Sequence, residues 1–170
     1  VVKILQSGGI SSTMSRIKQG IQRPAGASMY SDMGTGGADS AFTRLVTGNA
    51  QKARKKFSNA SVAGDYQIKM SLDVLERTDY YSYTYDNFGS ARDIANNGKS
   101  PIELVKDLNS YFGSSNELMF RNGINSRYFT EIMCNSSQER QHLLSELRAQ
   151  GIMDINGIDI EKFITVGSGL

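Results

Sequence analysis

The sequence predicts an α+β fold in which helices accompany a sheet. Apolar residues follow helical spacing near both ends of the chain, whereas strand-type patterns are concentrated in the middle. The order lacks the regular strand–helix repetition of a doubly wound sheet. We therefore expect one domain over residues 1–170, with residues 136–170 as a C-terminal helical extension within it.

The composition is that of an ordinary soluble domain. The chain has 170 residues, of which 39% are apolar and 21% are charged, which is enough for a core of its own. A net charge of +2 is too small to indicate nucleic-acid binding by itself. Cys134 is the single cysteine and excludes an internal disulfide, and no apolar run approaches the roughly 18 residues of a membrane span. Because the chain opens on Val1 rather than methionine, we expect it to be a fragment of a longer protein.

Two helices are expected at the start of the chain. Residues 1–7 place apolar side chains on one helical face, and Gly8 ends that helix. Ser11 or Ser12 can cap a second helix, which ends at Pro24. The apolar face of the second helix comprises Met14, Ile17 and Ile21.

Residues 33–47 join a glycine-rich turn to a strand-like run. Glycines in the turn permit close approach of a ligand or another backbone; they are Gly34, Gly36 and Gly37. Asp39 and Ser40 are typical turn residues. The buried strand expected after them contains Phe42, Leu45, Val46 and Thr47. This combination suits a ligand site, and a tight turn before a core strand would have the same pattern.

A short basic helix is predicted over residues 50–57. Its cationic residues are Lys52, Arg54, Lys55 and Lys56. Such a run is commonly a solvated helix face, and the alternative is a patch that contacts phosphate groups.

Two strands are expected next. Residues 67–75 alternate apolar and polar side chains, which predicts a half-buried strand. Residues 79–88 are rich in tyrosine, and if this segment is extended, Tyr81, Tyr83 and Tyr85 share one face. These rings would either pack in the core or stack on a planar ring such as nicotinamide, adenine or an unpaired base.

Two capping boxes mark helix starts in the second half of the chain. The first pairs Ser100 with Glu103, and the second pairs Ser136 with Glu139. The first helix is expected to bury Ile102, Val105, Leu108 and Phe112. The second is expected to bury Leu143, Leu144 and Leu147. An Asn-Gly turn at residues 156–157 precedes a short apolar segment.

Between these helices the pattern predicts strands. Residues 117–120 form one, Asn122 and Gly123 form a tight turn, and residues 128–134 return as another strand. Glu117 opens the first of these strands. A carboxylate in this position is often simply solvated; alternatively, it hydrogen-bonds a hydroxyl and stabilises the positive charge that develops on a sugar carbon.

Spacing excludes several common sites. Residues 98–100, Gly-Lys-Ser, end like a P-loop, but the first glycine of that motif would fall at Asp93. Residues 34–36, Gly-Thr-Gly, would need a glycine at Asp39 to match a dinucleotide fingerprint, and they precede a strand rather than a helix. His142 is the single histidine and is expected at the surface, so we expect neither a zinc site nor a Ser-His-Asp triad.

Three segments resemble the ADP-ribosyltransferase superfamily, especially its bacterial toxin-type members. Residues 2–10 (VKILQSGGI) look like the helix and turn that follow the family's first strand. Residues 37–44 (GADSAFTR) look like the middle strand, which carries an aromatic and a hydroxyl residue against the nicotinamide ribose. Residues 115–120 (SNELMF) look like the late strand that opens with the catalytic glutamate.

The resemblance implies an ADP-ribosyltransferase-like split, mixed or antiparallel sheet with flanking helices, which binds NAD as a substrate in its cleft, without a metal. Glu117 would hold the nicotinamide ribose and favour departure of nicotinamide. The family's first strand would lie upstream of Val1, and Arg44 would replace the cation that this strand supplies. The NAD-binding residues would be Gly36, Gly37, Asp39, Phe42, Thr43, Tyr81 and Tyr83. Contacts to a macromolecular substrate would come from Lys52, Arg54, Lys55 and Lys56.

The chain also departs from the family. Ser115 stands where arginine-modifying members carry Gln or Glu, which leaves nucleic acid or a hydroxyl or carboxylate side chain as the acceptor. Residues 136–170 have no counterpart. The implied function is transfer of ADP-ribose to nucleic acid or protein by a toxin or defence effector. Such a protein would be cytoplasmic or delivered to a target cytoplasm, with an inhibitor or antitoxin protein as a further partner and no membrane contact. The alternatives are a non-catalytic binding module on the same scaffold and an NAD glycohydrolase.

Overall fold

The computed structural model describes residues 1–20, 37–46, 66–84, 96–110 and 116–167. The chain divides into two compact units, each assembled from segments that are distant in sequence. Unit 1 comprises Val1–Ile10, Ser61–Val74 and Asn125–Leu170, and unit 2 comprises Ser11–Ala60 and Leu75–Ile124. The single domain expected over the whole chain stays a prediction. The α+β class is confirmed, because each unit combines helices with a small antiparallel or mixed sheet.

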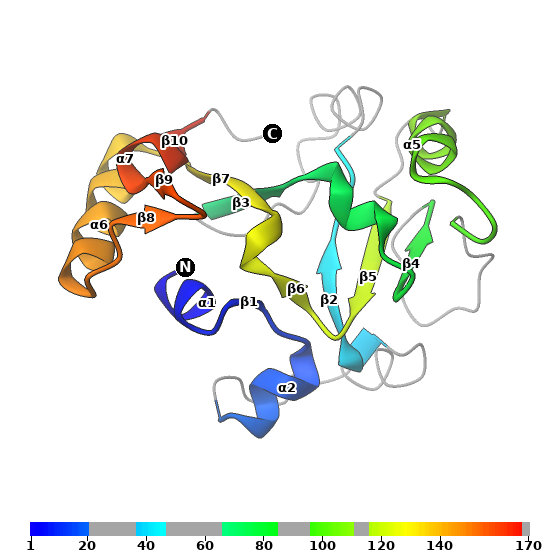
Figure 1. The fold of residues 1–170 in the computed structure, drawn as a ribbon, viewed down its shortest axis with the longest axis horizontal. Helices are drawn as coiled ribbons and strands as arrows, with labels where there is room; N and C mark the ends of the chain where they lie inside the picture. The colour runs from blue at the N-terminus through cyan, green and yellow to red at the C-terminus, as the bar shows by residue number, and fades with distance from the viewer. Residues whose placement is uncertain (21–36, 47–65, 85–95, 111–115, 168–170) are drawn as a thin grey trace. The chain divides into compact units, whose positions relative to one another are not determined.

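Unit 2 is built on a three-stranded antiparallel sheet (Figure 1). Its strand order is β2 (Ser40–Thr43), β5 (Glu117–Arg121) and β4 (Tyr80–Tyr83), so β5 is paired on both sides. The ring of Phe120 on β5 is buried and stacks on Tyr80 of β4, with ring centroids 4.9 Å apart. The middle strand therefore lies at the core of this unit.

Short helices accompany this sheet. They are α2 (Thr13–Lys18), the 3-10 helix η1 (Gly37–Asp39) and α5 (Pro101–Ser110). Ser12 caps α2 by accepting a hydrogen bond from the N–H of Ser15, as the sequence predicts.

The capping box predicted for α5 is present. The carboxylate of Glu103 accepts hydrogen bonds from the backbone N–H and the hydroxyl of Ser100, at 2.8 and 2.7 Å. The predicted inward face is wrong at Ile102, which is 68% exposed. Leu104 is fully buried instead, together with Leu108 one turn later, because residues four apart share a helix face.

Unit 1 contains a three-stranded mixed sheet in the order β10 (Ile164–Val166), β7 (Phe129–Cys134) and β3 (Tyr66–Met70) (Figure 1). β3 runs antiparallel to β7, and β10 runs parallel to it. Ile132 and Cys134 of β7 have no exposed surface. The strand that is paired on both sides thus again carries the core.

The largest helix of unit 1 is α6 (Ser137–Ala149). Its predicted capping box is present: Ser136 accepts from the N–H of Glu139 at 3.2 Å, and the Glu139 carboxylate accepts from the N–H of Ser136 at 3.0 Å. Its buried residues are those predicted, Leu143, Leu144 and Leu147. The remaining elements of unit 1 are α1 (Val2–Gln6), β1 (Gly9–Ile10), η3 (Ser126–Tyr128), β8 (Asp154–Ile155), β9 (Ile158–Asp159) and α7 (Ile160–Phe163). Of the helices that the structure describes, even α6 with its 13 residues falls short of a bilayer span.

The predicted Asn-Gly turn after β5 is present. Asn122 and Gly123 have φ values of 66° and 74°, the left-handed pair that a type I′ turn requires. The chain continues through the short β6 (Ile124–Asn125) and η3 into β7. β7 forms where a strand was predicted, but it pairs with β3 and β10 rather than with β5.

The strand predicted through residue 47 is shorter than expected. β2 ends at Thr43, and Val46 beyond it is 40% exposed. Within the strand, Phe42 is 39% exposed rather than buried. The ladder stops because the backbone of Leu45 binds the side chain of Asn116 instead of a neighbouring strand.

The strand predicted over residues 67–75 is wrong beyond Met70. The chain turns there into the 3-10 helix η2 (Leu72–Glu76), which leads toward β4. The carbonyl of Ser71 accepts the N–H of Val74 at 3.2 Å. Local hydrogen bonds of this kind compete with a sheet ladder, so the apolar alternation does not continue as a strand.

Candidate functional site

Glu117 is the first residue of β5, as the sequence predicts. The residue is half-buried, and its Oε1 atom is shielded from solvent. Asn116, immediately before it, is 2% exposed. The carboxylate therefore lies in surroundings drier than an exposed loop would provide. Its catalytic role stays a prediction.

The neighbouring strands bring other predicted residues next to Glu117. On β4, Tyr83 is its direct partner in the antiparallel ladder. On β2, Thr43 pairs with Leu118, and continuing this register by one residue puts Arg44 opposite Glu117. Three distant segments of the chain thus meet at one end of this sheet.

Strand alternation decides which side chains share the face of Glu117. Residues directly opposite in antiparallel strands point to the same face. Phe42 and Tyr81 are both partners of Met119, two residues after Glu117, and so they lie on this face. Phe42 is 39% exposed and Tyr81 is half-buried, whereas Tyr83 is only 7% exposed. A planar ligand could reach the rings of Phe42 and Tyr81, while the ring of Tyr83 is packed.

Other predicted residues are not brought together with Glu117. Thr43 lies on the opposite face, with its hydroxyl donating to the carbonyl of Leu118 at 3.4 Å. Gly37 and Asp39 belong to η1, which precedes β2, and Asp39 is exposed.

Sequence reasoning missed Asn116. Its side-chain Nδ2 donates to the carbonyl of Leu45, and its Oδ1 accepts from the N–H of Leu45, both at 2.8 Å. These two bonds stand where the next backbone pair of the ladder would be, and they hold the segment containing Arg44 beside the start of β5. The only sequence signal was an amide residue directly before a predicted strand.

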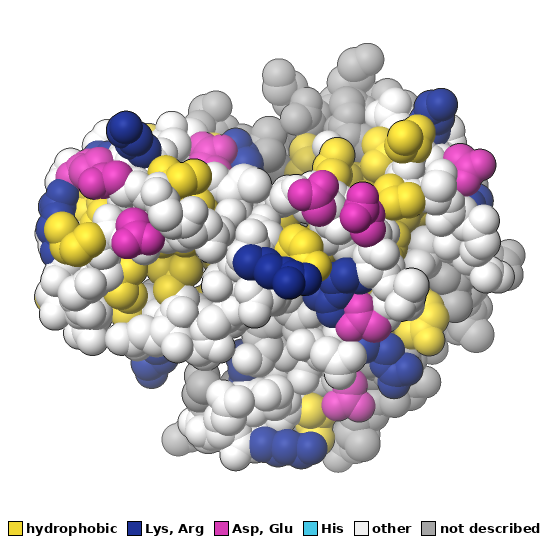
Figure 2. Space-filling view, viewed as in Figure 1, with side chains coloured by type: hydrophobic (Ala, Val, Ile, Leu, Met, Phe, Trp, Pro, Cys, Tyr) yellow, Lys and Arg dark blue, Asp and Glu magenta, His cyan; other side chains and the backbone are white. Residues whose placement is uncertain are grey.

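Several predicted residues lie outside the part of the chain that the structure describes. They are Ile21, Pro24, Gly34, Gly36, Thr47, Lys52, Arg54, Lys55, Lys56, Tyr85, Phe112 and Ser115. The basic helix expected to contact phosphate is therefore not described. On the face shown in Figure 2, the described Lys and Arg side chains are interspersed with Asp and Glu.

A pocket of about 530 Å³ lies in unit 2, formed by residues 75–78, the start of β4 and the segment that leads into α5. Of the predicted NAD-binding residues that the structure describes, Tyr81 alone is in its lining. Arg77 in its wall binds both carboxylate oxygens of Asp79, at 2.7 and 2.5 Å, and donates to the carbonyl of Gly123 at 2.8 Å. Hydrogen bonding to this guanidinium lowers the pKa of Asp79 below its usual value of 3.8.

The described residues offer little for a metal or for imidazole chemistry. They contain no group of three or more His, Cys, Asp or Glu side chains that could hold an ion. His142 is at the surface as predicted, with its side chain 68% exposed and its Nε2 atom 3.6 Å from the Glu146 carboxylate. Neither observation bears on the role of Glu117.

Comparison with protein-family models finds no match, and neither the search of curated proteins nor that of solved structures returns a significant match. The function must therefore be argued from the site itself. The site offers a carboxylate on a middle strand and two accessible aromatic rings on the same face, and the segment that contains Arg44 is held beside the start of that strand.

Proposed function

We propose that this chain is an NAD-dependent ADP-ribosyltransferase that transfers ADP-ribose to a macromolecular acceptor. The observation that carries the proposal is the position of Glu117 at the start of β5. The strands on both sides of β5 have an aromatic residue, Phe42 or Tyr81, on the same sheet face as Glu117. This arrangement agrees with the resemblance of residues 37–44 and 115–120 to the middle and late strands of that superfamily. It also supports the finer proposal of an ADP-ribosyltransferase-like split sheet.

The chemistry requires stabilisation of a developing cation. The bond between the nicotinamide nitrogen and the ribose carbon breaks, and its electron pair leaves with nicotinamide. Positive charge builds on the sugar carbon, where the carboxylate of Glu117 would stabilise it more strongly in a partly desolvated site than in water. The acceptor then forms the new bond to this carbon and loses its proton. Arg44 would balance the charge of the NAD pyrophosphate, and Phe42 or Tyr81 would stack on a ring.

The acceptor is proposed to be nucleic acid or a protein hydroxyl or carboxylate group. Ser115 supports this choice, since the arginine-modifying members that the chain resembles carry Gln or Glu there. As a toxin or defence effector acting in the cytoplasm, the protein would be controlled by an inhibitor or antitoxin protein.

The test is NAD consumption by the full chain, with total cellular protein and RNA as acceptors. We expect the Glu117→Gln variant to lose about a hundredfold or more of the activity, because it keeps the shape of the side chain and removes its charge. Glu146→Gln is the matched control, since this carboxylate lies on the exposed face of α6. Labelled protein or RNA would identify the acceptor class, and free ADP-ribose alone would identify a glycohydrolase. The proposal would be overturned if the chain showed no NAD turnover and no NAD binding by calorimetry, and a non-catalytic binding module would then remain.

A further inference from the structure

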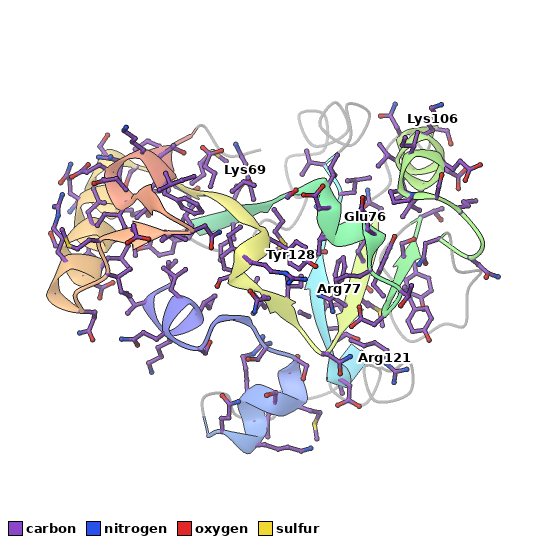
Figure 3. All side chains as sticks on the ribbon, viewed as in Figure 1. Lys69, Glu76, Arg77, Lys106, Arg121 and Tyr128 are labelled. Atoms are coloured by element: carbon purple, nitrogen blue, oxygen red, sulfur yellow. The ribbon has the colours of Figure 1, made fainter. Side chains whose placement is uncertain are left out.

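Glu117 is not in the lining of the unit 2 pocket, although Tyr81, which lies on the same sheet face as Glu117, is. The wall of this pocket includes Glu76 and Arg77, adjacent residues labelled in Figure 3 where η2 leads toward β4, and the half-buried Tyr81. Lys99 and Pro101, at the start of α5, also line the pocket. A volume of about 530 Å³ is within the range of small-ligand sites.

The side chain of Asn96, in the lining of the pocket, makes hydrogen bonds to the backbone of β4 like those of a neighbouring strand. Asn96 accepts from the N–H of Ser82 at 2.9 Å and donates to the carbonyl of Tyr80 at 3.0 Å. The amide of Asn96 is therefore hydrogen-bonded to the edge of β4. The hydroxyl of Tyr80 is also hydrogen-bonded, because it donates to the carbonyl of Leu75 at 3.1 Å. These bonds fix the spacing between β4 and the segments on either side of it.

The positive charges in the lining are already neutralised. Arg77 is bound to Asp79, and Lys99 forms an ion pair with Asp107 at 2.6 Å. The N-terminus of α5 has the carboxylate of Glu103 against it. An anionic ligand would have to compete with three carboxylates, so the pocket does not suit phosphate.

Glu76 is different. Within the described residues no hydrogen bond or ion pair engages its carboxylate, and it is the exposed last residue of η2 and part of the pocket lining. Tyr81 and Pro101 line the same pocket. A carboxylate beside an aromatic ring is the combination that recognises a guanidinium, which accepts stacking on its plane while donating paired hydrogen bonds.

We propose that this pocket binds an arginine side chain within a segment of a partner protein. Because the space exceeds that of one side chain, neighbouring residues of the segment would also be accommodated. Glu76 pairs with the guanidinium, and Tyr81 stacks on it. The inference goes beyond the proposed function. Tyr81 is also one of the two rings proposed to stack on NAD, so the test is made without NAD and does not depend on that function.

The probe is the capped peptide acetyl-Gly-Arg-Gly-amide, titrated into the labelled full chain without NAD. Binding is followed by the amide signals of Asn97 and Gly98, which line the pocket. We expect saturable millimolar binding that weakens as salt is raised. The same peptide with citrulline, which is neutral and nearly the same shape, should bind at least about tenfold more weakly.

Variants assign the contact to the pocket. Glu76→Gln should weaken binding of the arginine peptide about tenfold, and Tyr81→Leu should weaken it about fivefold. Glu146→Gln, an exposed carboxylate of α6, should leave the affinity unchanged. Unshifted signals from the rest of unit 2 would establish that each variant is folded.

Three outcomes would overturn the inference. They are equal binding of the citrulline peptide, an affinity insensitive to Glu76→Gln, and no saturable shift up to about 20 mM peptide. Saturable binding of inorganic phosphate at the same signals would likewise replace it with an anion site. Since the titration contains no NAD, its failure is distinguishable from failure of the proposed function.

Discussion

The amide of Asn116 binds both backbone polar groups of Leu45, at 2.8 Å each, across 71 residues of sequence. A side chain here supplies the donor and the acceptor that a neighbouring strand would otherwise supply. The consequence is that β2 stops at Thr43 while the next residues stay beside β5. The segment that contains Arg44 is thereby kept beside the start of β5, where Glu117 lies.

Replacing Asn116 with alanine should lower the free energy of unfolding by about 2–4 kcal/mol, because it leaves both backbone groups of Leu45 without their partner at a site that is 2% exposed. Urea denaturation measures the loss, and hydrogen exchange at the Leu45 amide should accelerate. Gln138→Ala, an exposed position on α6, is the control and should change stability by less than about 0.5 kcal/mol. If Asn116→Ala were as stable as this control, the two hydrogen bonds between Asn116 and Leu45 would not stabilise the fold as we expect.

The Arg77–Asp79 pair should make stability depend on pH. The pKa of Asp79 is lowered in the folded chain by the guanidinium of Arg77, so the pair stabilises the fold fully above the unfolded value near 3.8. That contribution is lost as the pH falls through the lower, folded pKa. The stability difference between the natural chain and Asp79→Asn should therefore be constant between pH 5 and 7, roughly, and shrink below about pH 4.

Urea denaturation over this pH range provides the measurement. Asp73→Asn serves as the control, because Asp73 is an exposed carboxylate that forms no ion pair with the described residues. The effect of Asp73→Asn on the free energy of unfolding should not shrink below about pH 4 as that of Asp79→Asn does. A difference for Asp79→Asn that stays the same down to about pH 2 would contradict the prediction.

The inward face of α5 can be tested by two alanine substitutions. Leu104 has no exposed surface, so Leu104→Ala should cost about 2–5 kcal/mol of unfolding free energy. Ile102→Ala should cost less than about 0.5 kcal/mol, because that residue is 68% exposed. Thermal denaturation of the two variants provides the measurement. Equal losses of unfolding free energy would contradict the inward position of Leu104 and favour the inward position expected for Ile102 from the sequence.

Cys134 should resist modification in the native chain. It is fully buried in β7, and burial raises the pKa of its thiol, so both access and thiolate formation are suppressed. Reaction with Ellman's reagent should be at least about a thousandfold slower than in denaturing urea. Comparable rates in the two conditions would show that the core of unit 1 opens readily.

Local signals in the sequence were reliable where the interacting groups lie within a few residues. The capping boxes at Ser100 and Ser136 and the turn at Asn122 are present as predicted. The start of β5 at Glu117 was also predicted correctly. Each depends on hydrogen bonds or φ angles that neighbouring residues determine by themselves.

The tertiary structure decided where strands end and what flanks the site. The apolar alternation through Leu75 indicated a strand, but the hydrogen bond from Val74 to Ser71 turned the chain after Met70. No local pattern indicated that Asn116 would hold Leu45. Pairings of this kind depend on partners many residues away, whose energies outweigh local propensity. The sequence by itself therefore determined the α+β class and the position of the carboxylate, and only the packing of distant strands decided which residues surround it.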